Sequence, residues 1–188
     1  MARERLVASE ADGDRLTELE LVGLDVLLLV AGHETTVSLI GNSIYALINN
    51  PAHLELTSRG EGDARVLIDE MLRFDSPVQM TTRIALKPVN FGDVTVPTGH
   101  ILVLMLGSAN HDPLIFDNPG QLNISGDRQA SHLSFGSGIH YCLGAALARA
   151  EGEVVVTEMI RRFPNLTLID EPQMRPTFVL RGREDLRV

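Results

Sequence analysis

Cys142 is the only cysteine among the 188 residues, and it lies in the stretch FGSGIHYCLG, residues 135–144. Three glycines of this stretch, Gly136, Gly138 and Gly144, would let the backbone bend and allow a flat molecule to approach closely. A helix-like run follows at once, which predicts that Cys142 lies at or just before a helix N-terminus. Unpaired amides and the helix dipole at that place favour a thiolate over a thiol. The sulfur is therefore a candidate metal ligand or nucleophile.

The residues around Cys142 bear on which of these roles it has. An isolated cysteine is more often an inert, buried small side chain than a reactive one. Zinc and iron–sulfur sites need several thiolates, or thiolates with histidines. Cys142 and His140 together supply too few ligands for either kind of site. One thiolate is enough for the axial ligand of a haem iron, because the porphyrin supplies the other four ligands. Haem ligation therefore fits Cys142 better than a zinc or cluster site.

A second group of polar residues interrupts an apolar stretch. Residues 19–48 are apolar on nearly every face, as in a helix from the middle of a protein. Within them, AGHETT (residues 31–36) places Glu34 and Thr35 where an unpartnered acid is costly. A surface kink with solvated side chains is the alternative interpretation. A zinc-protease motif would require a histidine in place of Val37 and is excluded.

The boundaries of two helices can be predicted from their caps. Thr17 and Glu20 have the spacing of a capping box, which predicts that the long apolar helix begins there. A second helix is expected over residues 64–74. Within it, Glu70 and Arg73 stand three residues apart, and such pairs are usually exposed and contribute only about 0.2 to 0.5 kcal/mol. On spacing alone, a solvated pair is the preferred interpretation.

Taken together, these motifs resemble the cytochrome P-450 monooxygenases of bacterial type. The resemblance implies that Cys142 is the proximal ligand of haem b, with Phe135 packed beside the sulfur and His140 near a haem propionate. Gly136 and Gly144 would let backbone amides donate hydrogen bonds to the sulfur, which tunes the iron. The matching positions of the haem-binding loop are Phe135, Gly136, Gly138, His140, Cys142 and Gly144, followed by Leu147, Ala148 and Arg149.

The resemblance also assigns roles within AGHETT and in the segment TTRIA. Gly32 would make room for dioxygen. Glu34 and Thr35 would form the acid and alcohol pair that brings protons into a dry pocket for cleavage of the O–O bond. Arg83 would reach a haem propionate, whereas the alternative is an arginine on the rim of a strand.

By the same resemblance, Glu70 and Arg73 form a buried structural pair that supports the proximal side of the haem. Members of the family commonly carry an arginine near position 121 that joins this pair. Here Gln121, Leu122 and Asn123 do not reproduce that arginine. The sequence therefore supplies no third side chain for the network.

The predicted fold is mainly α with small β-hairpins. Short β-type runs occur at residues 83–86, 94–96 and 101–106, an irregular segment follows at 107–134, and the tail predicts a terminal hairpin. The resemblance implies the C-terminal portion of the cytochrome P-450 fold, with a long central helix and a haem-binding cysteine loop. We therefore expect one partial domain over residues 1–188, with the N-terminal half of the family fold absent.

Charge and composition limit the partners. A net charge of −9 argues against nucleic acid or an anionic membrane surface, because phosphate groups are bound by clustered Lys and Arg. One cysteine excludes an internal disulfide, and the lack of a signal-peptide apolar region indicates a reducing cytoplasm. The longest continuous apolar run, residues 26–31, is too short to span a bilayer.

The favoured function is that of a haem-dependent monooxygenase. It would insert one oxygen atom of O₂ into a small lipophilic substrate, with electrons from a separate ferredoxin or reductase. The alternatives are a truncated haem-binding, partner or regulatory module without turnover, and a non-functional fragment. Without the other half of the family fold, one apolar face of residues 21–48 would be wet, so self-association or a partner chain is expected to cover it.

Overall fold

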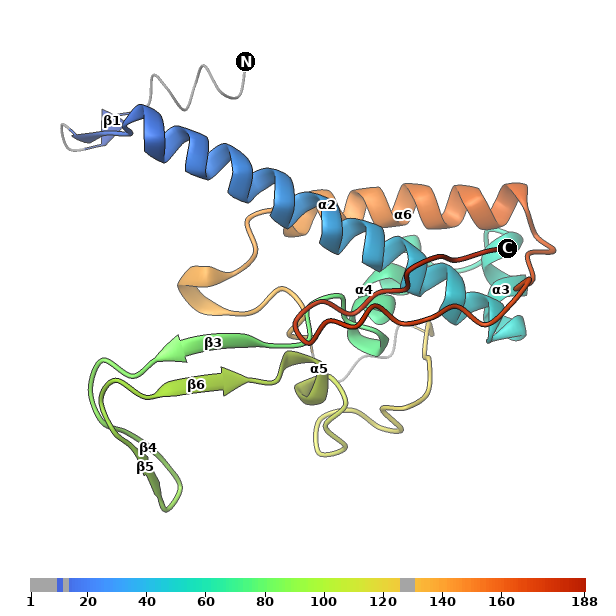
Figure 1. Cartoon of the computed structure of the whole chain (residues 1–188). Helices are drawn as coiled ribbons and strands as arrows, with labels where there is room; N and C mark the ends of the chain where they lie inside the picture. The colour runs from blue at the N-terminus through green and yellow to red at the C-terminus, as the bar shows by residue number, and fades with distance from the viewer. Residues whose placement is uncertain (1–9, 12–13, 126–130) are drawn as a thin grey trace. The chain divides into compact units, whose positions relative to one another are not determined.

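The computed structural model describes residues 10–11, 14–125 and 131–188 (Figure 1). The chain divides into two compact units, Met1–Glu34 and Thr35–Val188. The described residues form helices and three small two-stranded sheets, which confirms the predicted mainly α fold class. The assignment of the whole chain to one domain stays a prediction.

Helix α2 (Glu18–Ile48) begins and ends where the sequence predicts. The Thr17 amide donates to Glu20 Oε2 at 2.8 Å, and the Glu20 amide donates to Thr17 Oγ1 at 3.3 Å. These bonds are the reciprocal pair of a capping box. Hydrogen bonds from the Thr17 backbone and side chain also hold the pKa of Glu20 below its ordinary value.

The two halves of α2 differ in burial. The C-terminal half buries Leu39, Ile44 and Leu47, whereas most apolar side chains of the N-terminal half are exposed, Leu29 by 72%; Leu21 is buried there. The uncovered apolar face expected from the sequence therefore lies on the N-terminal half. The helix is also long and apolar enough to cross a membrane, a test that the core helices of soluble proteins pass as well, so the expectation of no membrane stays a prediction.

Three further helices pack around the C-terminal half of α2. Helix α4 (Ala64–Phe74) begins as predicted, with the Arg65 amide donating to the Asp63 carboxylate at 2.8 Å. It packs against α6 (Ala145–Arg162), as does α3 (Pro51–Ser58). The side chains of the shared core include Leu39, Ile44 and Leu47 of α2, Leu67, Ile68 and Met71 of α4, and Val156 and Ile160 of α6.

Helix α3 was missed in the sequence. The run Asn49-Asn50-Pro51 indicates a helix stop, which is correct for α2. Proline also fits the first position of a new helix, because its missing N–H is one that a helix start leaves unpaired. Pro51 serves as that first residue.

Each of the small sheets is a pair of antiparallel strands. Strand β3 (Thr81–Ile84) pairs with β6 (Ile101–Leu104), and β4 (Val89–Phe91) pairs with β5 (Val94–Val96). The remaining pair is β1 (Glu10–Ala11) with β2 (Asp14–Arg15).

The structure modifies two of the predicted details after β6. The strand predicted to reach residue 106 ends at Leu104, because Leu106–Ala109 forms the short helix α5. The predicted terminal hairpin is present without regular strands: the Arg175 amide donates to the Gly182 carbonyl at 2.9 Å and the Glu184 amide to the Gln173 carbonyl at 3.0 Å, around an isolated antiparallel bridge between Met174 and Arg183. A second isolated bridge pairs Leu180 with Val78.

Candidate functional site

Cys142 is exposed on a loop that is closed by its own backbone. The Cys142 amide donates to the Phe135 carbonyl at 3.0 Å, across the short helix η1 (Gly138–His140). Gly136 and Gly138 have φ angles of +69° and +71°, a conformation that favours glycine. Helix α6 starts three residues after the cysteine, as predicted.

The surroundings of the Cys142 thiol fit a flat apolar group. Ile139 and Leu143, on the same loop, are 97% and 90% exposed. Gly144 lies beside the sulfur, because a Cβ built on it would be 4.0 Å from Cys142 Sγ. A lone thiol among exposed apolar side chains matches a haem that takes one axial ligand from the protein and buries its faces against apolar groups.

Among the described residues, no group of three or more His, Cys, Asp and Glu side chains could hold a metal ion. The one cysteine is the donor that the chain offers to an iron already held by a porphyrin. The residues that are present therefore fit a thiolate-ligated haem.

The predicted propionate residues are placed on separate elements. His140 is exposed at the end of η1, and Arg83 is half-buried on β3. The Arg83 guanidinium donates to Thr81 Oγ1 at 3.2 Å and to the Thr82 carbonyl at 2.8 Å. Thr82 and Ile84 are the exposed residues of β3, as its alternation predicts. The propionate roles of His140 and Arg83 stay predictions.

The residues of AGHETT are consecutive in α2, where the first unit ends and the second begins. Glu34 and Thr35 are half-buried. A Cβ built on Gly32 would meet no described atom within 4 Å outside the helix's own backbone. The role of Gly32 in dioxygen binding and the roles of Glu34 and Thr35 in proton delivery stay predictions.

Glu70 and Arg73 form a buried ion pair. They are 2% and 4% exposed, so the solvated interpretation does not describe them. Arg73 Nε donates to Glu70 Oε2 at 2.9 Å, and Arg73 Nη2 donates to Glu70 Oε1 at 2.7 Å. Arg73 also donates to the backbone carbonyls of Asn110, Pro119 and Gln121, at 3.0, 2.8 and 2.9 Å.

The irregular segment completes this pair through its backbone. The five hydrogen bonds of Arg73 match the five N–H donors of a guanidinium. Glu70 Oε1 also accepts from the Asn123 amide at 2.9 Å. Backbone groups thus take the place of the side chain that the sequence lacks near position 121.

Sequence reasoning missed a buried polar cluster at the start of the cysteine loop. Asn110 Nδ2 donates to Ser76 Oγ and Ser134 Oγ, both at 2.8 Å, and Asn110 Oδ1 accepts from the Leu133 amide at 2.7 Å. Ser134 Oγ in turn donates to the Leu72 carbonyl at 2.7 Å. From residue type alone, Asn110 indicates only a turn in the irregular segment.

Sequence reasoning also missed Asp69 and His132. Asp69 Oδ1 accepts from Arg149 Nε at 2.6 Å and from His132 Nε2 at 3.2 Å. Burial raises the pKa of Asp69, but the hydrogen bonds and charges of His132 and Arg149 outweigh it and lower the pKa to about 2. The signal in the sequence is Arg149 of the cysteine motif, a cation that needs an acidic partner when it is largely buried.

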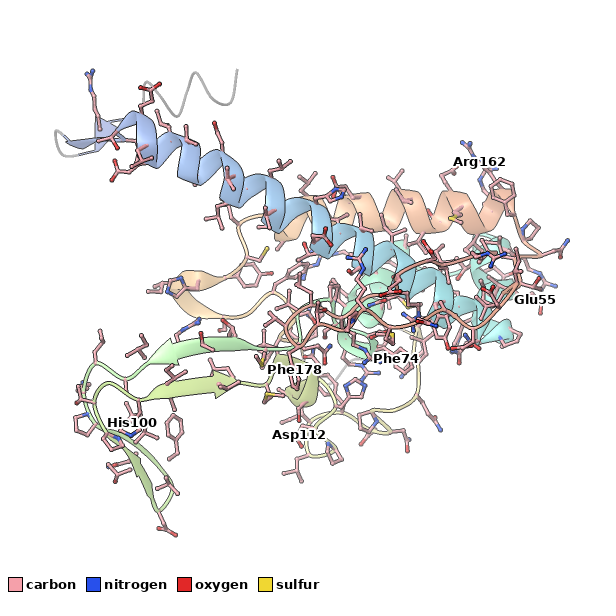
Figure 2. The ribbon with its side chains drawn as sticks, viewed as in Figure 1. Glu55, Phe74, His100, Asp112, Arg162 and Phe178 are labelled. Atoms are coloured by element: carbon pink, nitrogen blue, oxygen red, sulfur yellow. The ribbon has the colours of Figure 1, made fainter. Side chains whose placement is uncertain are left out.

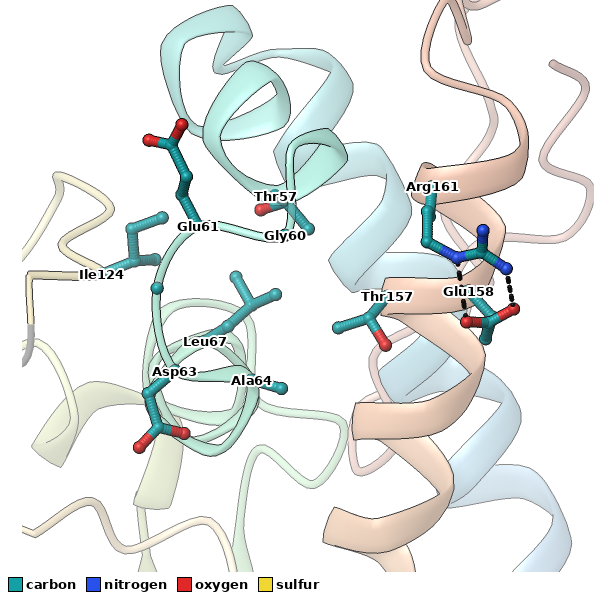
Figure 3. A pocket seen from close by; sticks show the side chains of 11 residues that line it. Thr57, Gly60, Glu61, Asp63, Ala64, Leu67, Ile124, Thr157, Glu158 and Arg161 are labelled. Atoms are coloured by element: carbon teal, nitrogen blue, oxygen red, sulfur yellow. Dashed lines mark hydrogen bonds and ion pairs between the residues drawn. The ribbon is translucent and has the colours of Figure 1, made fainter.

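A cleft of about 230 Å³ lies away from these residues (Figure 3). It is bounded by the turn before α4, with Glu61 and Asp63, and by α6, with Thr157 and Arg161. Arg161 is paired with Glu158 at 2.8 Å. None of the predicted site residues lines the cleft.

The comparisons with known proteins agree with one another. The family description "Cytochrome P450" matches residues 64–183. Cytochrome P450 107B1 of Saccharopolyspora erythraea is 42% identical over 97% of this chain and 46% of that protein. Vitamin D(3) 25-hydroxylase of Pseudonocardia autotrophica is 41% identical over 94% of this chain and 45% of that protein.

A solved structure gives the same result. CYP109E1 from Bacillus megaterium, in complex with testosterone, matches with a TM-score of 0.88 and 36% identity, over 97% of this chain and 51% of that one. The chain spans about half the length of the relatives that it matches. The fold, the cysteine loop and these similarities lead to one conclusion: the chain belongs to the cytochrome P450 family.

Proposed function

We propose that this chain supplies the haem-binding part of a haem-thiolate monooxygenase, with Cys142 as the axial ligand. The observation that carries the proposal is the exposed Cys142 thiol on a glycine-containing, backbone-closed loop, in a chain of the cytochrome P450 family. When bound, haem supplies the activation of dioxygen that inserts one oxygen atom into a substrate.

The loop residues hold the sulfur in place. The bond from the Cys142 amide to the Phe135 carbonyl fixes the backbone of the ligand. Gly136 gives the loop its positive φ angle, and Gly144 keeps the space beside the sulfur free of a side chain. His140 and Arg83 are the hydrogen-bond donors that we assign to the haem carboxylates.

We assign proton delivery to α2. Glu34 is half-buried, and in the proposed role its carboxylate would take protons from water and pass them to the haem side of the helix. The Thr35 hydroxyl can accept a proton and pass one on, because it is both donor and acceptor. Gly32, with open space around it, leaves room for a small molecule beside this pair.

The proposed substrate is a small lipophilic molecule. One similar protein is named for vitamin D(3), and another was solved in complex with testosterone; both molecules are largely apolar. Electrons would come from a separate ferredoxin or reductase in the cytoplasm.

Haem titration tests the proposal. The chain is mixed with haem, reduced and exposed to carbon monoxide, and we expect a red-shifted Soret band typical of thiolate ligation. Cys142→Ala should abolish this band, whereas Ser137→Ala, an exposed position on the same loop, should keep it. No haem uptake by the unaltered chain would refute the proposal and leave the non-functional fragment.

A second candidate function is a haem-binding or partner module without turnover. The exposed apolar side chains on the N-terminal half of α2, which a partner chain could cover, favour it. Oxygenated product from a lipophilic probe, with a surrogate oxidant, separates the two candidates. Haem binding without product would favour the module.

A further inference from the structure

We propose that Asp69 is a positioning residue that fixes the Cys142 loop by binding both of its ends. The inference rests on the proposed function only for the role of Cys142 as a ligand. The loop itself, and what holds it, are described by contacts within the second unit.

The two flanks of the loop meet at one carboxylate oxygen. His132 precedes the loop and Arg149 follows it on α6, and both donate to Asp69 Oδ1, at 3.2 and 2.6 Å. The three side chains are 20% exposed or less, so solvent screens these bonds only in part. A single carboxylate therefore closes the segment that carries Cys142.

The orientation of His132 makes it a donor to Asp69. Its Nδ1 accepts from the Ser134 amide at 3.2 Å, so the proton that reaches Asp69 is on Nε2. Ser134 is also held by the buried bond from its hydroxyl to the Leu72 carbonyl. The start of the loop is therefore held against α4, the helix that carries Leu72 and Asp69.

Phe135 connects the carboxylate to the cysteine. The Arg149 guanidinium lies 4.6 Å from the centroid of the Phe135 ring, within the range of a cation–π contact. The rings of His132 and Tyr141 are 5.6 and 6.3 Å from the same ring. The Phe135 carbonyl accepts from the Cys142 amide, so the path from Asp69 to the ligand passes through one ring and one backbone bond.

Asp69 is itself held on a rigid base. It precedes Glu70, whose buried pair with Arg73 fixes α4 against the irregular segment. Arg149 is held further by a bond of 3.4 Å to the Tyr141 hydroxyl. A displaced Asp69 would therefore release both flanks together, whereas loss of the Tyr141 hydroxyl would release one contact of Arg149.

Hydrogen exchange of the haem-free full chain tests the inference directly. In Asp69→Asn, the amides of Gly136, Tyr141 and Cys142 should exchange about tenfold faster, because a charge-assisted bond that closes the loop is weakened. The slow amides in the cores of α4 and α6 should keep their rates. If the exchange rates rise equally in these helices and in the loop, or if the rates in the loop do not change, the proposal is wrong.

Glu158→Gln is the matched control for this experiment. Glu158 also accepts from two cationic side chains, Arg161 and Arg162, but on the exposed surface of α6. Its loss should leave the exchange of the cysteine loop unchanged. Faster exchange of the loop in this control would show a general effect of charge and would overturn the assignment to Asp69.

Arg149 variants test the path through Phe135. Arg149→Gln frees only the flank on α6 and leaves His132 bonded to Asp69, so its loop should exchange faster than that of the unaltered chain but more slowly than that of Asp69→Asn. Arg149→Lys keeps the charge beside Asp69 but loses the planar stack, so its loop should exchange at a rate between those of the unaltered chain and Arg149→Gln. Because Arg149 acts on the loop through Asp69, the double variant of Asp69→Asn and Arg149→Gln should exchange no faster than Asp69→Asn alone. Additive effects would overturn the link.

The haem-loaded protein gives an independent readout. In Asp69→Asn, part of the carbon monoxide complex should lose the red-shifted thiolate band, and Glu158→Gln should keep it. Absence of haem uptake by the unaltered chain refutes the proposed function, and the exchange experiment then decides this inference alone. Haem uptake with unchanged loop exchange in Asp69→Asn overturns the inference and leaves the proposed function standing.

Discussion

Arg73 on α4 donates a hydrogen bond of 2.9 Å to the backbone carbonyl of Gln121, in the irregular segment 48 residues further along the chain. Figure 2 shows how densely side chains gather around α4, where Phe74 is labelled. The bond completes a guanidinium whose other contacts are the Glu70 carboxylate and two more carbonyls. A structural ion pair is thereby satisfied without a third charged side chain.

The first prediction concerns the side chain of Gln121. Its carbonyl binds Arg73, whereas the residue itself is exposed. Gln121→Ala keeps the carbonyl, so the free energy of unfolding should change by less than about 0.5 kcal/mol. Urea denaturation measures this change. A large loss would show that the side chain takes part in the network.

The second prediction concerns the buried pair. Glu70→Ala leaves the Arg73 charge buried without its carboxylate, which should cost about 3 to 5 kcal/mol of stability. Glu55→Ala is the matched control, because the Glu55–Arg59 pair on α3 is exposed and should cost about 1 kcal/mol or less. Equal losses in the two variants, measured by urea denaturation, would contradict the structural role of Glu70.

The third prediction concerns proton delivery by Thr35. Under the proposed function, Thr35→Ala should leave haem binding intact but divert reducing equivalents to peroxide, because the hydroxyl is lost while the cysteine ligand is untouched. The measurement is peroxide formed per reductant consumed. Thr36→Ala, at the next position of α2, should keep the coupling of the unaltered chain. Unchanged coupling in Thr35→Ala would count against its role.

The fourth prediction is a pH dependence of stability that comes from Asp69. Its folded pKa of about 2 lies below its ordinary value of 3.8, because His132 and Arg149 donate to it. The ionised carboxylate therefore stabilises the fold above about pH 4, and this stabilisation is lost as the pH falls towards 2. Allowing for partial exposure, the effect is about 1 kcal/mol.

Comparison of the unaltered chain with Asp69→Asn measures this effect. Their difference in unfolding free energy should shrink between pH 4 and pH 2, the window that the two pKa values of Asp69 define. Glu158 titrates in the same pH range, because hydrogen bonds and charges from Arg161 and Arg162 lower its pKa to about 2. The comparison is therefore repeated in chains that carry Glu158→Gln, where the effect of Asp69→Asn on unfolding free energy should show the same dependence on pH. A difference that does not vary with pH would contradict the pKa of Asp69.

The fifth prediction concerns the exposed apolar side chains of α2. Leu29→Lys should weaken self-association of the chain, because covering one leucine contributes about 2 kcal/mol, or more than a tenfold change in the dissociation constant. Sedimentation measures the oligomeric state. Gln173→Lys adds the same charge at an exposed polar position and should have little effect. A chain that is monomeric at all concentrations would contradict this prediction.

Local patterns were sufficient for the helices that carry their own start signals. Thr17 with Glu20 and the cap at Asp63 involve residues within three positions of one another, so the sequence shows both partners at once. Cys142 was recognised for the same reason, because its motif is continuous in the chain. The run at Pro51 was ambiguous, since proline can end one helix and begin the next.

The sequence by itself determined the family, the cysteine and the order of the main helices, because these depend on residue type and short-range spacing. Only the tertiary structure decided what surrounds Asp69 and Arg73. Apart from Glu70, the hydrogen-bond partners of these two side chains lie 37 to 80 residues away, and the hydrogen-bond acceptors of Arg73 outside its helix are backbone carbonyls, which every residue carries. Because any residue can supply a backbone carbonyl, the residue types do not indicate which carbonyls bind Arg73. Only the folded structure shows them.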